Sequence, residues 1–436
     1  MEAVKVGLLG LGTVGCGVVR VLARNDEEIA RRAGRAIRIV RAASRDLSVS
    51  RDCDLSGIAL TNRAQDVVDD PEIDIVVELI GGTTIAYEMV MRAIDQGKHV
   101  VTANKALIAL YGNEIFARAS EQGVTVAFEA AVGGGIPIIK AIREALAGNT
   151  IEWLAGIING TGNFILSEMR DKGRDFEDVL SEAQSLGYAE ADPTFDVEGI
   201  DAAHKLTILA SIAFGIPLQY ERVYTEGITR ITREDVTYAA ELGYRIKHLG
   251  IARRRDSGIE LRVHPTLIPH RRLIANVDGV MNAVLVRADA VGSTLYYGPG
   301  AGAEPTASAV VADLVDVTRA LTVDPNNRVP HLAFHPDSLI DLQVLPIGEA
   351  VTAYYLRLRA QDRPGVLADI TRILGDLSIS IEAVLQRQPA EEATDASIVI
   401  ITAAVREANM DEAIRRIEAL ETTADHVTRI RLENLS

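Results

Sequence analysis

An acidic stretch that ends in a lysine holds the side chains best suited to chemistry. Five carboxylates precede Lys205 there: Glu190, Asp192, Asp196, Glu198 and Asp201. Apolar sequence flanks the stretch, and charge removed from water is costly unless it is paired or used. A lysine among carboxylates can bind an amino-acid zwitterion and transfer a proton. The stretch therefore indicates an enzyme that acts on a small polar amino acid, although Asp201 and Lys205 alone could form an ordinary surface pair on a helix.

A glycine-rich turn near the start of the chain predicts a dinucleotide site. It reads Gly10-Leu11-Gly12-Thr13-Val14-Gly15, after an expected strand at Val4–Leu9 and before an expected helix at 15–24. The first glycine permits a tight turn, the second lets the backbone approach a pyrophosphate, and the third lets helix and strand pack closely. The N–H groups at the helix start are donors for phosphate.

Two further strand ends supply candidate cofactor and substrate residues. The second strand ends in Ser44-Arg45-Asp46. A guanidinium at Arg45 suits a 2′-phosphate and favours NADP, whereas Asp46 keeps NAD possible. Asn104 and Lys105 follow the strand His99–Thr102 at the edge where open α/β sheets bind ligands. They are candidates to face the nicotinamide or the substrate, and a solvated loop charge is the alternative for both Arg45 and Lys105.

The loop at 129–137 joins a strand to a helix and contains three consecutive glycines. The Glu129 carboxylate and the exposed main-chain oxygens of such a loop can hold a hard cation. The same loop can also serve as a hinge between two domains. The residues taken alone favour the hinge.

Strand and helix patterns alternate along the first part of the chain and restart near its end. Further buried strands are expected at 38–43, 75–79, 99–102 and 124–128, and helices at 137–147 and 305–322. The order predicts an α/β protein with a Rossmann-type doubly wound parallel sheet. We expect a nucleotide-binding domain at 1–137, to which helix 305–322 returns, an α+β catalytic and dimerisation domain at 138–304, a proline-containing linker at 323–350, and a ferredoxin-like domain at 351–436.

The composition narrows the class of protein. The 436 residues carry a net charge of −16, which argues against nucleic acid as the main partner. No apolar run is long enough to span a bilayer, so no membrane partner is expected. The two cysteines, Cys16 and Cys53, predict neither a disulfide framework nor a cysteine metal site. We expect a cytoplasmic protein, because no leader pattern precedes the first strand.

Together these motifs resemble homoserine dehydrogenase over nearly the full length of the chain. Beyond the glycine turn, the matching segments are Thr102-Ala103-Asn104-Lys105-Ala106-Leu107, residues 129–137, Asn159-Gly160-Thr161-Gly162-Asn163-Phe164-Ile165-Leu166, residues 187–193, Asp201-Ala202-Ala203-His204-Lys205-Leu206 and Gly298-Pro299-Gly300-Ala301-Gly302. Two positions depart from the pattern. Gly162 stands where the family more often has threonine, and Phe164 where it more often has tyrosine.

The resemblance implies NAD(P)-dependent interconversion of L-aspartate 4-semialdehyde and L-homoserine, on the route to threonine, methionine and isoleucine. It implies catalytic roles for Lys205 and Lys105, and a contact between Gly302 and the cofactor. The implied substrate-binding residues are Glu190, Asp196, Asp201, Tyr188, Thr161 and Gly160. It also implies a monovalent cation, typically sodium, held by Glu129 and the main chain of Val132, Gly134 and Ile136. Because no kinase module precedes residue 1, a monofunctional enzyme is expected.

The last domain resembles an ACT domain, a small regulatory module that often binds amino acids. Asp362 and Pro364-Gly365 predict a tight turn between a strand and a helix, and the turn can approach a ligand through its backbone. The resemblance implies L-threonine as a feedback effector near Asp362, Gly365 and Val366. The alternative is a role in oligomerisation alone. ACT units commonly pair, so a homodimer or homotetramer is expected.

Other functions fit the sequence less well. Aspartate-semialdehyde dehydrogenase needs a nucleophilic cysteine in its catalytic region, and Cys16 and Cys53 lie too early in the chain. A hydroxy-acid dehydrogenase would need a histidine–carboxylate pair and an arginine anchor, which the patterns around His204, His264 and His270 do not show. A regulator that senses a dinucleotide and an amino acid without catalysis stays open, although the lysine among carboxylates argues against it.

Overall fold

The computed structural model describes residues 2–387 and 395–436. The chain divides into two compact units. Unit 1 comprises residues 1–154, 204–222 and 281–342, and unit 2 comprises residues 155–203, 223–280 and 343–436. Two elements run across the division, β7 (Ile151–Ile157) and α10 (Ile200–Phe214).

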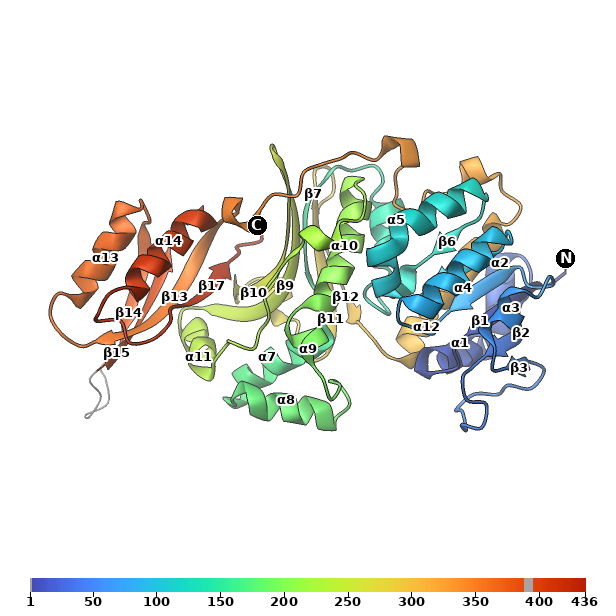
Figure 1. Cartoon of the computed structure of the whole chain (residues 1–436), viewed down its shortest axis with the longest axis horizontal. Helices are drawn as coiled ribbons and strands as arrows, with labels where there is room; N and C mark the ends of the chain where they lie inside the picture. Colours follow the sequence, from blue (N-terminus) through green and yellow to red (C-terminus); the bar gives the residue numbers. More distant parts are fainter. Residues whose placement is uncertain (1, 388–394) are drawn as a thin grey trace. The chain divides into compact units, whose positions relative to one another are not determined.

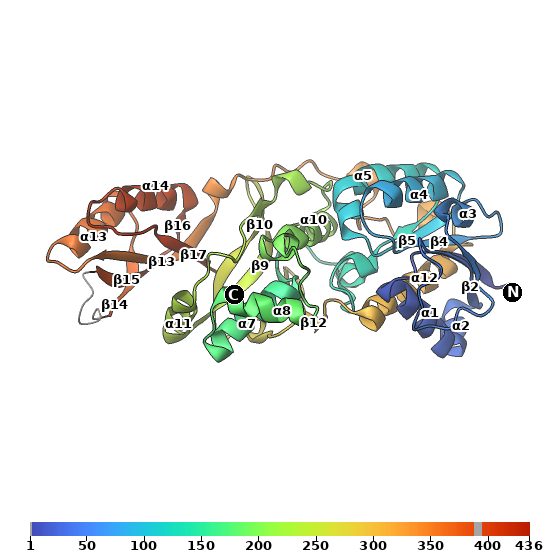
Figure 2. The same ribbon diagram turned by 60° about the horizontal axis from the view of Figure 1, so that its bottom comes forward.

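Unit 1 contains a six-stranded parallel sheet with the order β3-β2-β1-β4-β5-β6. Its strands are β1 (Val4–Leu9), β2 (Ile37–Ala43), β3 (Ala59–Thr61), β4 (Ile75–Glu78), β5 (His99–Thr102) and β6 (Val126–Ala127). Its helices are α1 (Thr13–Arg24), α2 (Asp26–Ala33), α3 (Ala64–Val68), α4 (Thr84–Asp95), α5 (Lys105–Glu121) and α6 (Ile138–Lys140). Figure 2 shows helices on both faces of this sheet, with α3, α4 and α5 on one face and α1 and α2 on the other. The predicted doubly wound sheet is therefore confirmed.

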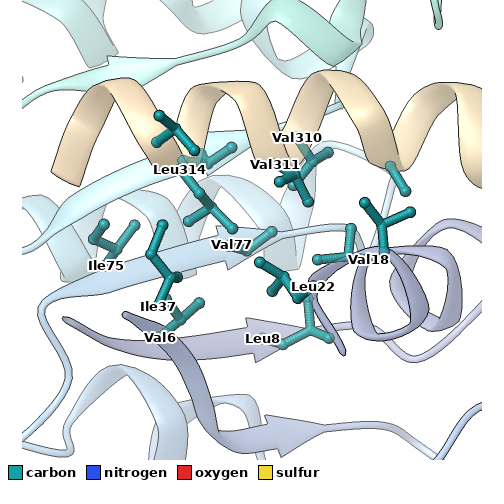
Figure 3. Close-up of a cluster of buried hydrophobic side chains, with 14 of the residues drawn as sticks. Val6, Leu8, Val18, Leu22, Ile37, Ile75, Val77, Val310, Val311 and Leu314 are labelled. Atoms are coloured by element: carbon teal, nitrogen blue, oxygen red, sulfur yellow. The ribbon is translucent and has the colours of Figure 1, made fainter. Parts of the chain in front are cut away.

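A late segment of the chain completes the core of unit 1. After the antiparallel pair β11 (Met281–Ala288) and β12 (Gly292–Pro299), helix α12 (Ala303–Ala320) packs on the sheet beside α1. Val310, Val311 and Leu314 of α12 lie in one apolar cluster with side chains of α1 and of strands β1, β2 and β4 (Figure 3). Helix α12 therefore packs on the same sheet as the helix that follows the glycine turn.

Two local predictions differ from the structure. The short edge strand β3 was not predicted, because its residues are largely exposed and lack the apolar run of a buried strand. Residues 137–147 form one turn of α-helix and then a π-helical turn at Ala141–Ala145, not a regular α-helix. In that turn Leu146 N donates to Ala141 O, five residues back.

Unit 2 is built on a mixed sheet whose strands come from distant parts of the chain. Its order is β9-β10-β17-β13-β15-β14, and β8 pairs with β10. The strands are β8 (Tyr224–Thr225), β9 (Tyr244–Arg255), β10 (Gly258–Pro269), β13 (Val351–Gln361), β14 (Ile381–Gln386), β15 (Asp395–Thr402) and β17 (Thr428–Leu432). The helices before residue 280 are α7 (Gly160–Lys172), α8 (Phe176–Ser185), α9 (Thr194–Val197) and α11 (Arg233–Glu241).

The C-terminal part of unit 2 has the expected β-α-β-β-α-β order. Helices α13 (Val366–Asp376) and α14 (Glu407–Glu418) cover one face of its four strands (Figures 1 and 2). A short strand, β16 (Val405–Arg406), pairs with the start of β13. The other face packs on residues of α7, α8 and α11. The strand β17 also pairs in parallel with β10, so the domain shares its sheet with the rest of the unit.

Among the helices that the structure describes, none combines the length and the apolarity needed to cross a bilayer.

Candidate active site

The glycine turn of unit 1 has the shape that a dinucleotide requires. Gly10 adopts a φ of 102°, and a Cβ there would lie 2.5 Å from Leu79 O. A Cβ on Gly15 would lie 2.1 Å from Gly10 O, so the helix approaches the strand as closely as backbones allow. A Cβ on Gly12 would meet nothing within 4 Å, which leaves the turn open where a phosphate would approach. The residues present therefore fit a dinucleotide.

The loop before α12 lies beside this turn. Gly302 is the N-cap residue of α12, and the second turn of α1 contacts the first residue of α12 directly. A Cβ on Gly17 would lie 2.6 Å from Ala303 O. The predicted cofactor residue Gly302 is therefore brought to the same edge of the sheet as Gly10–Gly15.

The end of β2 presents two arginines rather than one. Arg45 is exposed, and the Asp46 carboxylate accepts from Ser48 N at 2.8 Å and from Ser48 Oγ at 2.6 Å, bonds that lower the pKa of Asp46. The second is Arg51, which donates from Nη2 to Ser44 Oγ at 2.8 Å and from Nε to Leu11 O at 3.3 Å. No motif marked Arg51, because its position depends on how the loop folds back on the glycine turn.

Lys105 is the first residue of α5, and the loop that precedes it is held by several hydrogen bonds. The buried Glu78 accepts from Thr102 Oγ1 at 2.7 Å and from Ile80 N at 2.8 Å. Asn104 caps α5 by accepting from Leu107 N at 3.1 Å, and its Nδ2 donates to Gly82 O at 2.7 Å. Both ends of the Asn104 amide thus hold the loop that carries Lys105, and direct contact between this amide and the cofactor stays a prediction.

The 129–136 loop surrounds a buried carboxylate. Glu129 Oε1 accepts from Ile139 N at 2.9 Å and Oε2 from Lys140 N at 2.8 Å, while Glu129 N donates to Asp313 Oδ2 at 2.8 Å. Burial, helped by the nearby Asp313 charge, raises the pKa of Glu129 to about 7. Burial likewise raises the pKa of Asp313 to about 6, although Lys140 lies 3.6 Å away. Positive charge at this site would therefore be stabilising.

The same loop lies against the loop that precedes α12. Gly135 N donates to Pro299 O at 3.0 Å, and a Cβ on Gly134 would lie 2.5 Å from Gly300 O. The predicted cation loop and the predicted late cofactor loop are therefore adjacent parts of unit 1. Among the described residues, no group of three or more His, Cys, Asp or Glu side chains is arranged to hold a metal, so any cation here would depend on Glu129 and main-chain oxygens.

In unit 2, one amide joins two of the predicted substrate carboxylates. Asn159 Nδ2 donates to Asp196 Oδ1 at 2.8 Å and to Asp201 Oδ2 at 2.9 Å. Its Oδ1 accepts from Gly162 N at 2.7 Å and so caps α7. In the sequence, Asn159 is recognisable only as part of a motif. An asparagine directly before Gly-Thr-Gly is a helix-cap signal that could have indicated its position.

The remaining predicted substrate residues lie around the start of α7, which begins at Gly160. Thr161 Oγ1 donates to Tyr188 O at 2.6 Å, and the Tyr188 ring packs edge-on against Phe164 at 5.2 Å. Tyr188 is 44% exposed. Glu190 is exposed, and its main-chain oxygen accepts a hydrogen bond from Gln184 Nε2 at 3.1 Å. The acidic stretch thus contains both solvated carboxylates and the nearly buried Asp201, which the sequence did not distinguish.

Helix α10 carries Asp201 and Lys205 on successive turns, as predicted. Asp201 is 2% exposed and Lys205 is 8% exposed. An ordinary surface ion pair would have both groups in solvent, so the structure contradicts that alternative. Two ionisable groups buried one turn apart are more typical of a functional site.

The predicted effector turn is present at the start of α13. Gly365 is the N-cap residue, with a φ of 97°, and the exposed Asp362 accepts from Gln386 Nε2 at 3.5 Å. Val366 is buried in the core of the domain. The turn could present its backbone to a ligand, as the sequence indicated.

Family models match three consecutive parts of the chain. They are the homoserine dehydrogenase NAD-binding domain at residues 10–129, homoserine dehydrogenase at residues 137–315, and the ACT domain at residues 354–422.

Known proteins resemble the whole chain. A homoserine dehydrogenase of Pseudomonas aeruginosa is 65% identical over 436 residues, covering 100% of both chains, and one of Bacillus subtilis is 41% identical over 99% of both. The crystal structure of a homoserine dehydrogenase from Thiobacillus denitrificans, 68% identical, superposes with a TM-score of 0.95 and covers 100% of this chain and 99% of that one. A hyperthermophilic archaeal homoserine dehydrogenase in complex with NADPH is 27% identical, with a TM-score of 0.61, and covers 73% of this chain and 98% of that one.

Proposed function

This chain belongs to the homoserine dehydrogenase family, and we propose that Lys205 and Lys105 handle the proton when L-homoserine and L-aspartate 4-semialdehyde are interconverted. The chain is an NAD(P)-dependent oxidoreductase of amino-acid biosynthesis, so a sensor without catalysis is no longer a candidate. The observation that carries the assignment of residues is the Asn159 amide, which holds Asp196 and Asp201 together one helical turn before Lys205.

A bound dinucleotide supplies the hydride acceptor or donor. During reduction, negative charge builds on the aldehyde oxygen, and the Lys205 ammonium stabilises the alkoxide and donates a proton to it. During oxidation the same side chain, as the neutral amine, accepts the hydroxyl proton. Asp196 and Glu190 bind the substrate ammonium group, and Thr161, Gly160 and Tyr188 complete the substrate site. Lys105 is the second candidate for the proton.

Replacement of Lys205 tests this role. Lys205→Ala is expected to lower kcat for L-homoserine oxidation by roughly 10²- to 10⁴-fold, because general acid–base catalysis is lost. NADP(H) affinity, measured by fluorescence titration, is expected to stay close to that of the unaltered enzyme. The control is Lys172→Ala on α7, an exposed lysine paired with Glu168. Turnover of Lys205→Ala close to that of the control would contradict the assignment.

For the cofactor, we propose a preference for NADP(H) over NAD(H). Arg45 and Arg51 lie at the end of β2, where a 2′-phosphate would be bound, and the Asp46 carboxylate is engaged by Ser48. The archaeal relative in complex with NADPH supports the same preference. Parallel assays with NAD and NADP test it. Arg51→Ala is expected to raise KM for NADP by about tenfold, since a charge-assisted hydrogen bond is lost, and to leave KM for NAD nearly unchanged.

We also propose a sodium ion at Glu129 and the main-chain oxygens of Val132, Gly134 and Ile136. The donor set is entirely oxygen, which suits a hard cation. The carboxylate is buried beside a second carboxylate, Asp313, so a cation would offset unfavourable negative charge. Bound there, the ion would fix the loop that contacts residues 299–300.

The remaining assignments concern regulation and assembly. We propose the domain boundaries given above, a cytoplasmic location, a homodimer or homotetramer, and feedback by L-threonine at or near Asp362, Gly365 and Val366. The ACT-domain match supports an amino-acid effector. Sedimentation velocity of the full-length enzyme, with and without L-threonine, would give the subunit number and show whether the ligand changes it.

A further inference from the structure

A polar cavity of about 520 Å³ lies inside unit 2, away from the turn at 362–366. One wall is the segment 224–231 with Glu198, and the other is α14 with residues 426–429. This volume is within the range of small-molecule sites. The two walls are far apart in the sequence, and α14 of the second lies within the part of the chain that matches the ACT domain, residues 354–422.

The chemistry of the lining suits a small zwitterion. Four carboxylates and three guanidinium groups line the cavity, together with several hydroxyl groups and the apolar side chains of Ile231 and Ile414. A polyanion such as a nucleotide would be repelled by the carboxylates, and a simple cation by the arginines. Arg230 makes no ion pair or hydrogen bond within the described ranges 2–387 and 395–436, so its guanidinium is available to a ligand carboxylate.

The wall of the cavity is joined to the substrate carboxylates. Glu198 Oε1 accepts from Thr229 Oγ1 at 3.0 Å, and Ile228 N donates to Val197 O at 2.8 Å. The backbones touch here, because a Cβ on Gly227 would lie 2.7 Å from Val197 O. Glu198 follows directly after α9, which carries Asp196. A displacement of this wall would therefore move Asp196 relative to Asn159.

The ACT domain holds the same wall from the other side. Arg431 of β17 donates from Nη1 to Glu226 Oε2 at 2.8 Å and from Nε to Glu407 Oε2 at 2.8 Å. Tyr224 OH also donates to Glu226 Oε2, at 2.8 Å. The segment 224–229 is thus fixed to the ACT domain by a buried arginine and to α9 by its own backbone.

We infer that this cavity is an effector site for a small zwitterion of the amino-acid class, whose binding between Arg230 and the carboxylates of the opposite wall alters substrate affinity through Glu198 and Asp196. The inference rests on the proposed role of Asp196 in substrate binding. It differs from an effector bound at the turn 362–366, which lines no part of the cavity.

The test uses the full-length enzyme and each of the protein amino acids at millimolar concentration. At least one of them is expected to change KM for L-homoserine. Arg230→Ala and Arg415→Ala, two arginines of the lining, are each expected to raise the half-effective concentration by about tenfold, because each removes a charge-assisted contact. Calorimetric titration of the enzyme and the two variants with the same amino acid measures the loss of affinity independently of catalysis.

The matched control is Arg416→Ala. Arg415 and Arg416 are neighbours on α14 and both donate to Glu412, but only Arg415 lines the cavity. Arg416→Ala is expected to leave basal turnover and the effect unchanged. The inference is overturned if no amino acid changes KM, or if Asp362→Ala abolishes the effect while Arg230→Ala and Arg415→Ala leave it intact. Oxidation of L-homoserine by the unaltered enzyme without added amino acid tests the proposed function, so failure of that function can be told apart from failure of the effector site.

Discussion

The two units bury charge in different ways. The main apolar cluster of unit 1 spans α1, α12 and the parallel strands, and the buried charged groups of this unit include the carboxylates of Glu78, Glu129 and Asp313. In unit 2, by contrast, lie all three buried arginines of the described residues: Arg262, Arg357 and Arg431. A parallel sheet covered by helices on both faces needs only apolar runs to assemble. The sheet of unit 2 must instead select partners among strands that are distant in sequence.

Each buried arginine joins β13, or the segment from β17 to Glu433, to an earlier segment of unit 2. Arg262 donates to Glu433 at 2.5 Å, Arg431 to Glu226 at 2.8 Å, and Arg357 to Asp235 at 2.6 Å. Buried ion pairs add little net stability compared with well-packed apolar side chains, but an unpaired buried charge is strongly destabilising. We interpret the three pairs as determinants of strand partner and register, which apolar packing specifies less sharply.

The largest expected effect comes from removing one of these arginines. Arg431→Met is expected to lower the free energy of unfolding by about 3–5 kcal/mol, because Glu407 and Glu226 lose their buried partner. Urea unfolding followed by circular dichroism measures it. The control, Arg118→Met in unit 1, removes exposed pairs with Asp95 and Glu121 and is expected to cost at most about 1 kcal/mol. Equal losses in the two variants would remove the contrast between the units.

A pair of glycine variants tests the glycine turn of unit 1. Gly15→Ala places a methyl group against Gly10 O and is expected to destabilise the protein by about 1–3 kcal/mol, with loss of dinucleotide binding. Gly12→Ala enters open space and is expected to weaken NADPH binding with little change in stability. Thermal melts and NADPH titrations measure the two quantities. A stability loss in Gly12→Ala as large as that in Gly15→Ala would contradict the description of the turn.

A smaller effect concerns pH and sodium. Burial raises the pKa of Glu129 from its ordinary value of 4.5 to about 7. Between these two pH values the carboxyl group is protonated in the folded state and ionised in the unfolded state. The contribution of Glu129 to the stability of the fold therefore falls as pH rises through this window. In unit 2 the pKa of Glu433 is lowered, because nearby Arg262 and Arg253 outweigh the opposing effect of burial. Its stabilising contribution is present above 4.5 and is lost as pH falls below that value.

Because a proton and a cation compete for Glu129, sodium is expected to stabilise the enzyme by about 1 kcal/mol above pH 7 and by less below it. Melting temperatures in sodium chloride and choline chloride at matched ionic strength measure the difference. Glu129→Gln is expected to abolish it, whereas Glu144→Gln, an exposed control on the neighbouring turn, is not. A sodium effect that is independent of pH and survives in Glu129→Gln would place the cation elsewhere.

The sequence predicted best what depends on local pattern. The strands β1 and β5 begin and end as expected, and the glycine turn, the lysine on α10 and the ACT order of elements are all present. It missed Arg51 and the bridging role of Asn159, since both depend on loops folding onto distant segments. It could not separate the exposed Glu190 from the buried Asp201, because charge alone does not specify burial. The arginine pairs of unit 2 could not be predicted from the sequence either, because the two members of each pair lie 122 to 205 residues apart.

The pairing of β17 with β10 also constrains how the polypeptide reaches its native state. Residues 266–267 of β10 pair with residues 431–432 of β17, so the central sheet of unit 2 closes only after β17 has been synthesised. Until then the nascent chain exposes one edge of β10, which is a hazard for aggregation. Such non-local pairing is intrinsically slow to form. Unit 2 is therefore the part of the molecule whose maturation is expected to depend most on chaperones.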